Sequence, residues 1–258
     1  LISQTLMFGQ YQIRNGNFEA WDNVGNDYEE PTHWSSHMTN TGDYAGAADV
    51  KQIQRVADTH TGLGYSCKVW ARTALSFPVV VIANGTATTG RINVGSMSAS
   101  NTSNHTFTSQ TNADFNEPFT GKPDSIRFWA KFVCPNSSSQ YARLNAVIHS
   151  NFDYTDPETG SSSSYVVGKA LSEFQRGDQG WHQYTVPFDY ATYSSLGQTP
   201  QYILITFTTN RTPGAGAASD NLYMDDIEMV YNARLSDLKV GGTTISGFNS
   251  NTTDYTYA

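Results

Sequence analysis

Short stretches in which apolar and polar side chains alternate recur along this chain, and no other feature restricts its fold as much. Successive side chains of a β-strand point to opposite faces, so alternation indicates strands with one buried face. Helical spacing is nearly absent, with short helical turns predicted only at 43–50 and 169–174. The strand pattern runs through residues 66–74, 77–83, 125–133, 141–149, 182–188, 201–208 and 221–231.

Turn-forming residues separate these segments. Gly, Ser, Asn and Pro gather at 84–85, 135–139, 156–164 and 212–219. Charged residues make up only 15% of the chain and aromatic residues 13%, a balance that favours sheets with aromatic faces over solvated helices. We therefore predict an all-β fold, a two-sheet antiparallel jelly-roll β-sandwich with few short helical turns.

The acidic balance of the chain excludes several kinds of partner. The formal net charge is −8, so a phosphate backbone would be repelled and no nucleic acid is expected to bind. No stretch is apolar for long enough to span a bilayer, and no membrane insertion is expected. Catalytic motifs such as G-x-S-x-G and H-E-x-x-H are absent, and the six histidines show no metal-ligand spacing.

Both ends of the sequence differ from its middle. Residues 1–10 are apolar and uncharged, which predicts the remnant of a signal peptide or a flexible N-terminus, with an ordinary first strand as the alternative. The jelly roll is predicted over 11–231. Residues 232–258 repeat a strand–turn–strand pattern that is too short for a sandwich, so we expect the start of a second β-domain. An exported monomer, in the periplasm or on the outer cell surface, is the expectation.

Two cysteines leave two interpretations open. Cys67 and Cys134 permit one disulfide in an exported protein. The alternative is a pair of buried thiols at strand positions. Sequence alone does not show whether the two lie close enough to bond.

Two motifs at the ends of the predicted jelly roll resemble a known family. The first covers 13–21 (IRNGNFEAW) with PTHW at 31–34, and the second covers 222–231 (LYMDDIEMVY). Together they resemble the galactose-binding-like jelly rolls, to which many carbohydrate-binding modules belong. The runs at 119–131 and 181–190 narrow the resemblance to the carbohydrate metabolism domain family of polysaccharide-using gut bacteria. The tail from 232 is similar to the start of cadherin-like, immunoglobulin-type bacterial domains.

The resemblance implies a structural calcium ion. In related modules, the glutamate of the first motif and an aspartate of the last strand hold Ca²⁺ together with backbone carbonyls. The matching residues here are Glu19 and Asp225. Calcium prefers several hard oxygen ligands, which two carboxylates and carbonyls would supply. The alternative is that both carboxylates accept backbone N–H bonds.

A sugar-binding surface needs aromatic planes beside polar side chains, because sugar rings present both C–H patches and hydroxyls. The strand at 125–133 has an apolar face and a second face with an Arg–Trp–Lys stripe. We expect the polar face of the next strand and one further tryptophan to extend this surface, although core packing is the alternative for each aromatic. The predicted ligand-binding residues are Arg127, Trp129, Lys131, Arg143, Asn145, His149 and Trp181.

Three functions fit these observations. The preferred one is an exported carbohydrate-binding module of a glycan-utilisation or surface-adhesion protein, with a polysaccharide or oligosaccharide as its partner. A glycoside hydrolase is the second, but it requires a pair of carboxylates. A structural spacer domain of a surface protein is the third. The loops contain candidate carboxylates without any pairing in sequence: Asp153, Asp156, Glu158, Glu173 and Asp178.

Overall fold

The structure is a computed structural model. It describes residues 10–232 except 77–79 and 135–140, together with 239–240 and 243–244. The predicted leader and the predicted second β-domain therefore lie almost wholly outside the described residues. Within the second segment, β17 (Lys239–Val240) pairs with β18 (Thr243–Thr244).

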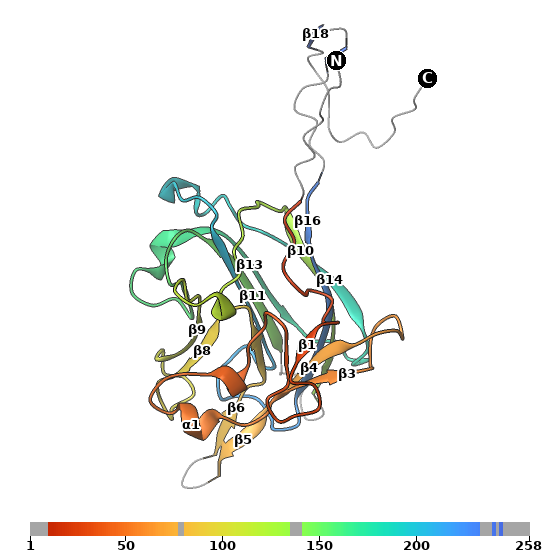
Figure 1. Ribbon diagram of the computed structural model, residues 1–258, viewed down its shortest axis with the longest axis vertical. Coiled ribbons are helices and arrows are strands. Elements are labelled where there is room, and N and C mark those ends of the chain that lie inside the picture. The colour runs from red at the N-terminus through yellow and green to blue at the C-terminus, as the bar shows by residue number, and fades with distance from the viewer. Residues whose placement is uncertain (1–9, 77–79, 135–140, 233–238, 241–242, 245–258) are drawn as a thin grey trace.

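Two antiparallel sheets form the body of the protein (Figure 1). The five-stranded sheet has the order β14-β10-β16-β4-β3, and the four-stranded sheet has the order β13-β11-β15-β7. The first contains β3 (Ile53–Val56), β4 (Ser66–Trp70), β10 (Ser125–Val133), β14 (His182–Pro187) and β16 (Asn221–Val230). The second contains β7 (Thr86–Thr88), β11 (Ala142–His149), β13 (Val166–Phe174) and β15 (Tyr202–Thr208).

The chain crosses repeatedly between the two sheets. It runs from β10 to β11 and β13 in the other sheet, back to β14, across to β15, and back again to β16. All of these strands pair antiparallel with their neighbours. This alternation is the jelly-roll arrangement, and it confirms the fold class predicted from the sequence.

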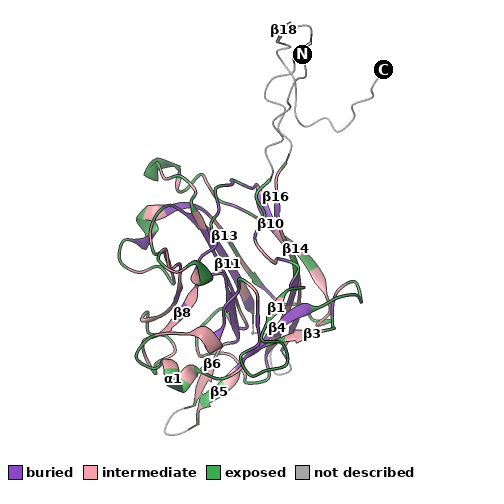
Figure 2. Cartoon of the chain, viewed as in Figure 1, coloured by how far each residue is buried: buried purple, intermediate pink, exposed green. Residues whose placement is uncertain are grey.

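The core lies between the sheets, and strands such as β11 and β15 contribute alternate residues to it. Figure 2 shows the buried stretches of these strands in purple. Phe128 of β10, for example, packs against Phe207 of β15, with ring centroids 5.2 Å apart. Side chains on the opposite face of β10 are only partly buried, as the alternation in the sequence predicted. The predicted helical turn at 169–174 was wrong: these residues belong to β13 and pair with β11. Apolar Ala170 and Phe174 are spaced as in a helix, but the long ladder to β11 determines the structure.

A third layer covers the outer face of the four-stranded sheet. It includes a small sheet of β8 (Arg91–Val94), β9 (Asn104–Phe107) and β12 (Thr155–Asp156), and a hairpin of β5 (Arg72–Leu75) and β6 (Val81–Ala83). The helix α1 (Ala45–Ala48) lies beside β8. Short elements complete the chain: β1 (Trp21–Asp22), β2 (Glu30–Pro31), and the 3-10 helices η1 (His37–Thr39), η2 (Ala113–Phe115), η3 (Ser162–Tyr165) and η4 (Ser194–Leu196).

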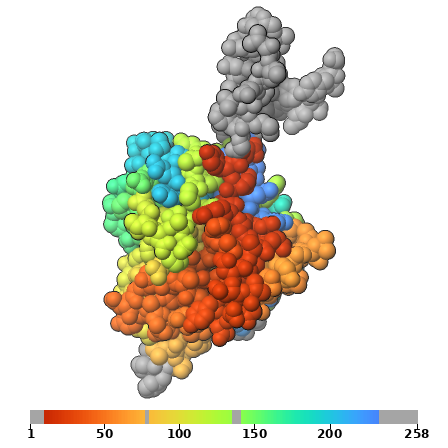
Figure 3. All heavy atoms as spheres, in the orientation of Figure 1, coloured from red at the N-terminus to blue at the C-terminus, as the bar shows by residue number. Residues whose placement is uncertain are grey.

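The N-terminal and C-terminal parts of the sandwich meet at one end. The side chain of Gln12 donates to the carbonyl of Met229 at 2.8 Å and accepts from its N–H at 2.7 Å. The hydroxyl of Tyr231 donates to the carbonyl of Tyr11 at 2.8 Å. Both segments lie at the upper end of the sandwich in Figure 1, whereas α1 and the β5–β6 hairpin lie at its lower end. In Figure 3, residues of the first fifth of the chain cover much of the visible face.

The two cysteines do not form a disulfide with each other. Cys67 of β4 is opposite Met224 of β16, and Met224 is opposite Ala130 of β10. Cys134 follows Ala130 by four residues, so the two cysteines are separated both across the sheet and along it. Burial raises the pKa of both thiols. Among the described residues, no helix is long and apolar enough to cross a membrane.

Candidate functional site

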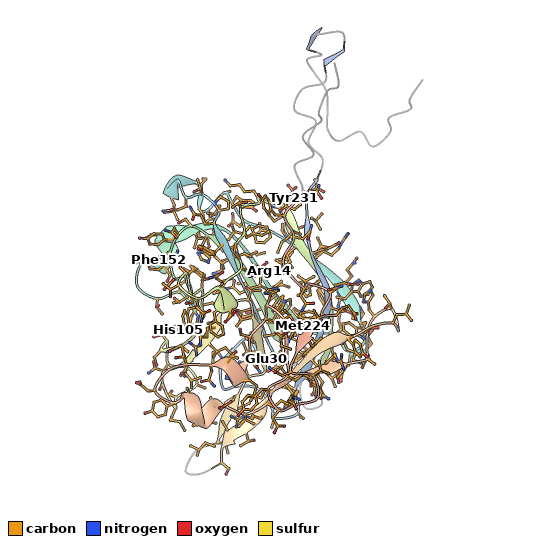
Figure 4. The ribbon with its side chains drawn as sticks, in the orientation of Figure 1. Arg14, Glu30, His105, Phe152, Met224 and Tyr231 are labelled. Carbon is orange, nitrogen blue, oxygen red and sulfur yellow. The ribbon has the colours of Figure 1, made fainter. Side chains whose placement is uncertain are left out.

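A cavity of about 220 Å³ lies between the outer face of the four-stranded sheet and the third layer. Strand β15 contributes Thr206 and Thr208 to the wall of this cavity, because Ile205 and Phe207, which alternate with them along the strand, face the core. Strands β8 and β9, α1 and the β5–β6 hairpin supply the remaining walls. His105 of β9, labelled in Figure 4, is one of the lining residues.

Threonine hydroxyls connect the sheet to the third layer at this cavity. The Oγ1 atom of Thr206 is 3.2 Å from that of Thr88 in β7 and 2.8 Å from that of Thr106 in β9. All three residues are buried. The chain of hydroxyls therefore holds three strands together and leaves a polar wall beside the cavity.

Arg143 of β11 also lines the cavity, as one of the residues predicted from sequence to bind a ligand. Its guanidinium donates two hydrogen bonds to the carboxylate of Asp156, at 2.9 and 2.8 Å. Burial by itself would lower the pKa of Arg143. The hydrogen bonds to Asp156 and its negative charge have the larger combined effect, so the pKa is raised above the ordinary arginine value. Both carboxylate oxygens of Asp156 are therefore engaged by Arg143 in a bidentate pair.

A buried histidine presents an acceptor with no partner. The Nε2 atom of His37 is 3.1 Å from the carbonyl of Asn84, which can only accept, so Nε2 carries the proton. Burial lowers the pKa of His37 to about 4, which keeps the ring neutral at pH 7. Nδ1 is then an acceptor, and it is buried without a hydrogen-bond partner among the described residues.

Asn84 repeats this pattern beside His37. Its amide nitrogen donates to the carbonyl of Asn210 at 3.1 Å. Its Oδ1 atom is buried, and no partner for it exists in the described part of the chain. Buried polar atoms without a partner are rare in folded proteins, because each carries an uncompensated desolvation cost. His37 and Asn84, which carry two such acceptors, both line the same cavity.

Arg72 of β5 contributes a positive charge. Its Nε donates to Oε1 of Gln52 at 3.1 Å, and one terminal nitrogen is 3.4 Å from the carbonyl of Ala47. Burial lowers its pKa from the ordinary arginine value. No carboxylate of the described residues forms an ion pair with it, in contrast to Arg143 and Arg211, which also line the cavity.

Two other predicted ligand-binding residues lie on the same sheet face as Arg143 but under the third layer. His149 is fully buried, with Nε2 2.8 Å from the hydroxyl of Thr108 and its ring between Tyr154 and Tyr202. Asn145 is also buried, and its Oδ1 has no partner among the described residues. Neither residue lines the cavity.

The remaining predicted ligand-binding residues lie on the other sheet, so the expected single surface is divided in two. Arg127 pairs with Glu228, and Lys131 pairs with Asp58. The indole of Trp181 donates to the same Asp58 at 3.0 Å. The polar groups of Arg127, Lys131 and Trp181 are therefore already bonded to acidic side chains of the protein itself.

The ring of Trp129 is partly covered by a loop. His60 stacks on it with centroids 4.4 Å apart and an angle of 11° between the rings. Trp129 also borders a second hollow of about 320 Å³ on the outer face of the five-stranded sheet. The other residues around this hollow are Asn17, Gln183, Asp226, Ile227 and Glu228.

The two predicted calcium ligands have protein partners. The backbone N–H of Tyr65 donates to Oε1 of Glu19 at 2.9 Å, and Nδ1 of His60 is 3.4 Å from the carboxylate of Asp225. No group of three or more His, Cys, Asp or Glu side chains in the described part of the chain could hold a metal ion. Glu19 and Asp225 are engaged by protein groups as placed, and the calcium ion that the resemblance implies stays a prediction.

The candidate hydrolase carboxylates are dispersed. Asp153 accepts from the N–H of Gln110, and Glu158 accepts from Tyr154 and Lys169. Glu173 pairs with Arg211 and Asp178 with His182. Of the candidates, Asp156 alone is among the described residues lining the cavity.

Sequence reasoning missed His37, Arg72 and Asn84. The sequence predicts a turn at Asn84–Gly85, and no sequence pattern indicates that η1 lies next to it. Arg72 fell inside the predicted strand 66–74, which the structure divides into β4 and β5. Only the long-range packing of the third layer brings these residues together.

Comparison with known proteins supports the fold. No protein-family model matches the chain, and no curated protein sequence matches it. A solved structure described as a proposed glycoside hydrolase from Bacteroides thetaiotaomicron aligns with a TM-score of 0.61 and 19% identity, over 87% of this chain and 72% of that one. A second, from Bacteroides vulgatus, aligns with a TM-score of 0.55 and 17% identity, over 83% of this chain and 96% of that one. At these identities the likeness is one of fold.

Proposed function

We propose that this protein binds carbohydrate in the cavity on the four-stranded sheet, without hydrolysing it. The observation that carries the proposal is the pair of buried acceptors, His37 Nδ1 and Asn84 Oδ1, that have no partner among the described residues. Both atoms belong to residues that line the cavity, so a small movement of either side chain would bring its acceptor within reach of a ligand hydroxyl. Sugars supply several hydroxyls in a small volume, and the threonine hydroxyls in the wall of the cavity can both donate and accept.

The apolar part of the lining suits the same ligand class. Ala47, Ala83 and Val94 belong to the wall, and they can pack against the C–H faces of a sugar ring. Small-ligand sites are commonly apolar with a few well-placed polar groups. The proposed glycoside hydrolases that share the fold agree with a carbohydrate ligand. An exported location, expected from the sequence, is retained in this proposal.

Hydrolysis is less well supported, because it needs two carboxylates on either side of the scissile bond. Asp156 supplies the one carboxylate among the described residues that line the cavity. Arg143 donates hydrogen bonds to both oxygens of that carboxylate, so neither oxygen is free to carry a proton toward a leaving group. Asp156 is thus poorly suited to act as a general acid.

The test is to fill the cavity. Ala47 is an exposed residue of α1 that lines it, so Ala47→Trp should block ligand entry without removing a core contact. We expect glycan-array and calorimetric binding to be lost with the thermal midpoint almost unchanged. Ala45→Trp is the matched control, since Ala45 lies on the same helix and does not line the cavity. Equal binding by Ala47→Trp and the wild type would contradict the proposal.

A further inference from the structure

We infer that the carbohydrate bound in the cavity is acidic, and that Arg72 is the residue that recognises its negative charge. This inference rests on the proposed function and specifies its ligand class. It starts from an imbalance of charge in the wall of the cavity. Arg72, Arg143 and Arg211 line the cavity, while Asp156 is the one carboxylate among its described lining residues.

Two of the three arginines are neutralised within the protein. Arg143 is bonded to both oxygens of Asp156, and Arg211 pairs with Glu173 at 2.9 Å. Arg72 differs, because within the described part of the chain it bonds only to the neutral oxygens of Gln52 and Ala47 and to no carboxylate. A guanidinium that is partly removed from water and lacks a counter-ion binds an anion more strongly than a fully solvated one.

The positive charge of Arg72 is opposite in sign to the net charge of the chain. The chain has 15 basic and 23 acidic residues and a net charge of −8. A general attraction for anions is therefore not expected. Any preference for an anionic ligand has to arise locally, and Arg72 provides the local charge. Gln52 fixes the position of that charge, because its Oε1 accepts from Arg72 while its Nε2 donates to the carbonyl of Trp70 at 2.8 Å.

The acceptors of His37 and Asn84 lie near Arg72, so a ligand that binds Arg72 can also place hydroxyl donors beside them. The charge of Arg72 contributes to lowering the pKa of His37, after the larger effect of burial, so the two side chains are close enough to interact. The amide of Gln52 also reaches the carbonyl of Asn84 at 3.3 Å. One small region therefore combines an uncompensated cation with two acceptors that need donors. A sugar bearing a carboxylate or a sulfate offers both kinds of group.

The guanidinium fork matches carboxylate and sulfate oxygens alike, so the shared chemistry is an anionic saccharide. Calorimetry with three probes of equal length separates the sources: a galacturonate trisaccharide, a sulfated galactose trisaccharide and a neutral galactose trisaccharide. We expect one of the anionic probes to bind at least about tenfold more tightly than the neutral one at low salt, which corresponds to a single charge-assisted contact.

Substitution of Arg72 tests the assignment. In Arg72→Gln the ratio of anionic to neutral affinity should fall from at least about tenfold to near one, whereas Arg72→Lys should keep part of the preference. Arg176→Gln is the matched control: it also removes one positive charge, but from an exposed arginine that does not line the cavity. The control should keep the full ratio, which excludes an effect of net charge. Circular dichroism and the thermal midpoint verify that each variant is folded.

The outcomes separate the two proposals. If no probe binds and the glycan array is also negative, the proposed function itself fails. If the neutral trisaccharide binds as tightly as both anionic ones, carbohydrate binding stands and the inference about charge is overturned. A preference for the anionic probe that persists in Arg72→Gln would overturn the assignment to Arg72.

Discussion

Among individual residues, His149 shows most clearly how burial changes the role expected from a sequence. It was predicted to bind ligand because it follows the polar face of its strand. The third layer covers that face, so the imidazole lies between Tyr154 and Tyr202 and bonds to Thr108. Arg143, six residues earlier on the same face, does reach the cavity. Alternation in a strand predicts the face of a side chain but not what covers that face.

The burial of His149 predicts a pH dependence of stability. Burial lowers its pKa to about 4 from the ordinary value of 6.5, so the folded state resists protonation. The stabilisation is complete above pH 6.5 and is lost as the pH falls toward 4. We expect His149→Gln to lose stability relative to the wild type at pH 7.5, and to lose about 2–3 kcal/mol less at pH 4.5.

Urea unfolding at pH 7.5, 5.5 and 4.5 measures this difference. His37 titrates with the same sign, since its pKa is also lowered to about 4, but it is present in both proteins and cancels in the comparison. A free-energy difference between the two proteins that does not change with pH would contradict the prediction.

At the level of elements, alternation along β10, β11, β15 and β16 was enough to predict the two sheets. It could not predict β8 and β9, whose short segments acquire their structure from packing over the four-stranded sheet. The same limit explains why the Arg–Trp–Lys stripe and Arg143 were expected on one surface. Adjacent strands in the sequence, β10 and β11, belong to different sheets.

The loop that carries Asp58 and His60 predicts a structural role for Trp129. Its ring stacks on His60, and His60 contacts Asp225 on the neighbouring strand. We expect Trp129→Ala to lower the free energy of unfolding by roughly 1–3 kcal/mol, because the stacked contact and buried area are lost. Glycan affinity should change by less than about twofold. A loss of binding in a folded Trp129→Ala protein would instead place the ligand in the hollow beside Trp129.

For the whole molecule, a bound ion would appear as added stability, since a ligand that binds only the folded state raises the thermal midpoint. Glu19 and Asp225 have protein partners, so we expect the midpoint to differ by less than about 1 °C between millimolar calcium and EDTA. Differential scanning calorimetry measures this. A rise of several degrees with calcium that is lost in Glu19→Gln would restore the calcium site predicted from sequence.

The paired ends of the sandwich have a mechanical consequence. Gln12 lies against Met229 and Tyr11 against Tyr231, in antiparallel directions, at the end opposite α1 and the β5–β6 hairpin. A force that pulls on both ends would therefore break these hydrogen bonds one after another, as in the opening of a zipper, and would not shear them together. The cavity lies at the far pole, outside the path of that force, and would keep its shape through the first steps of extension.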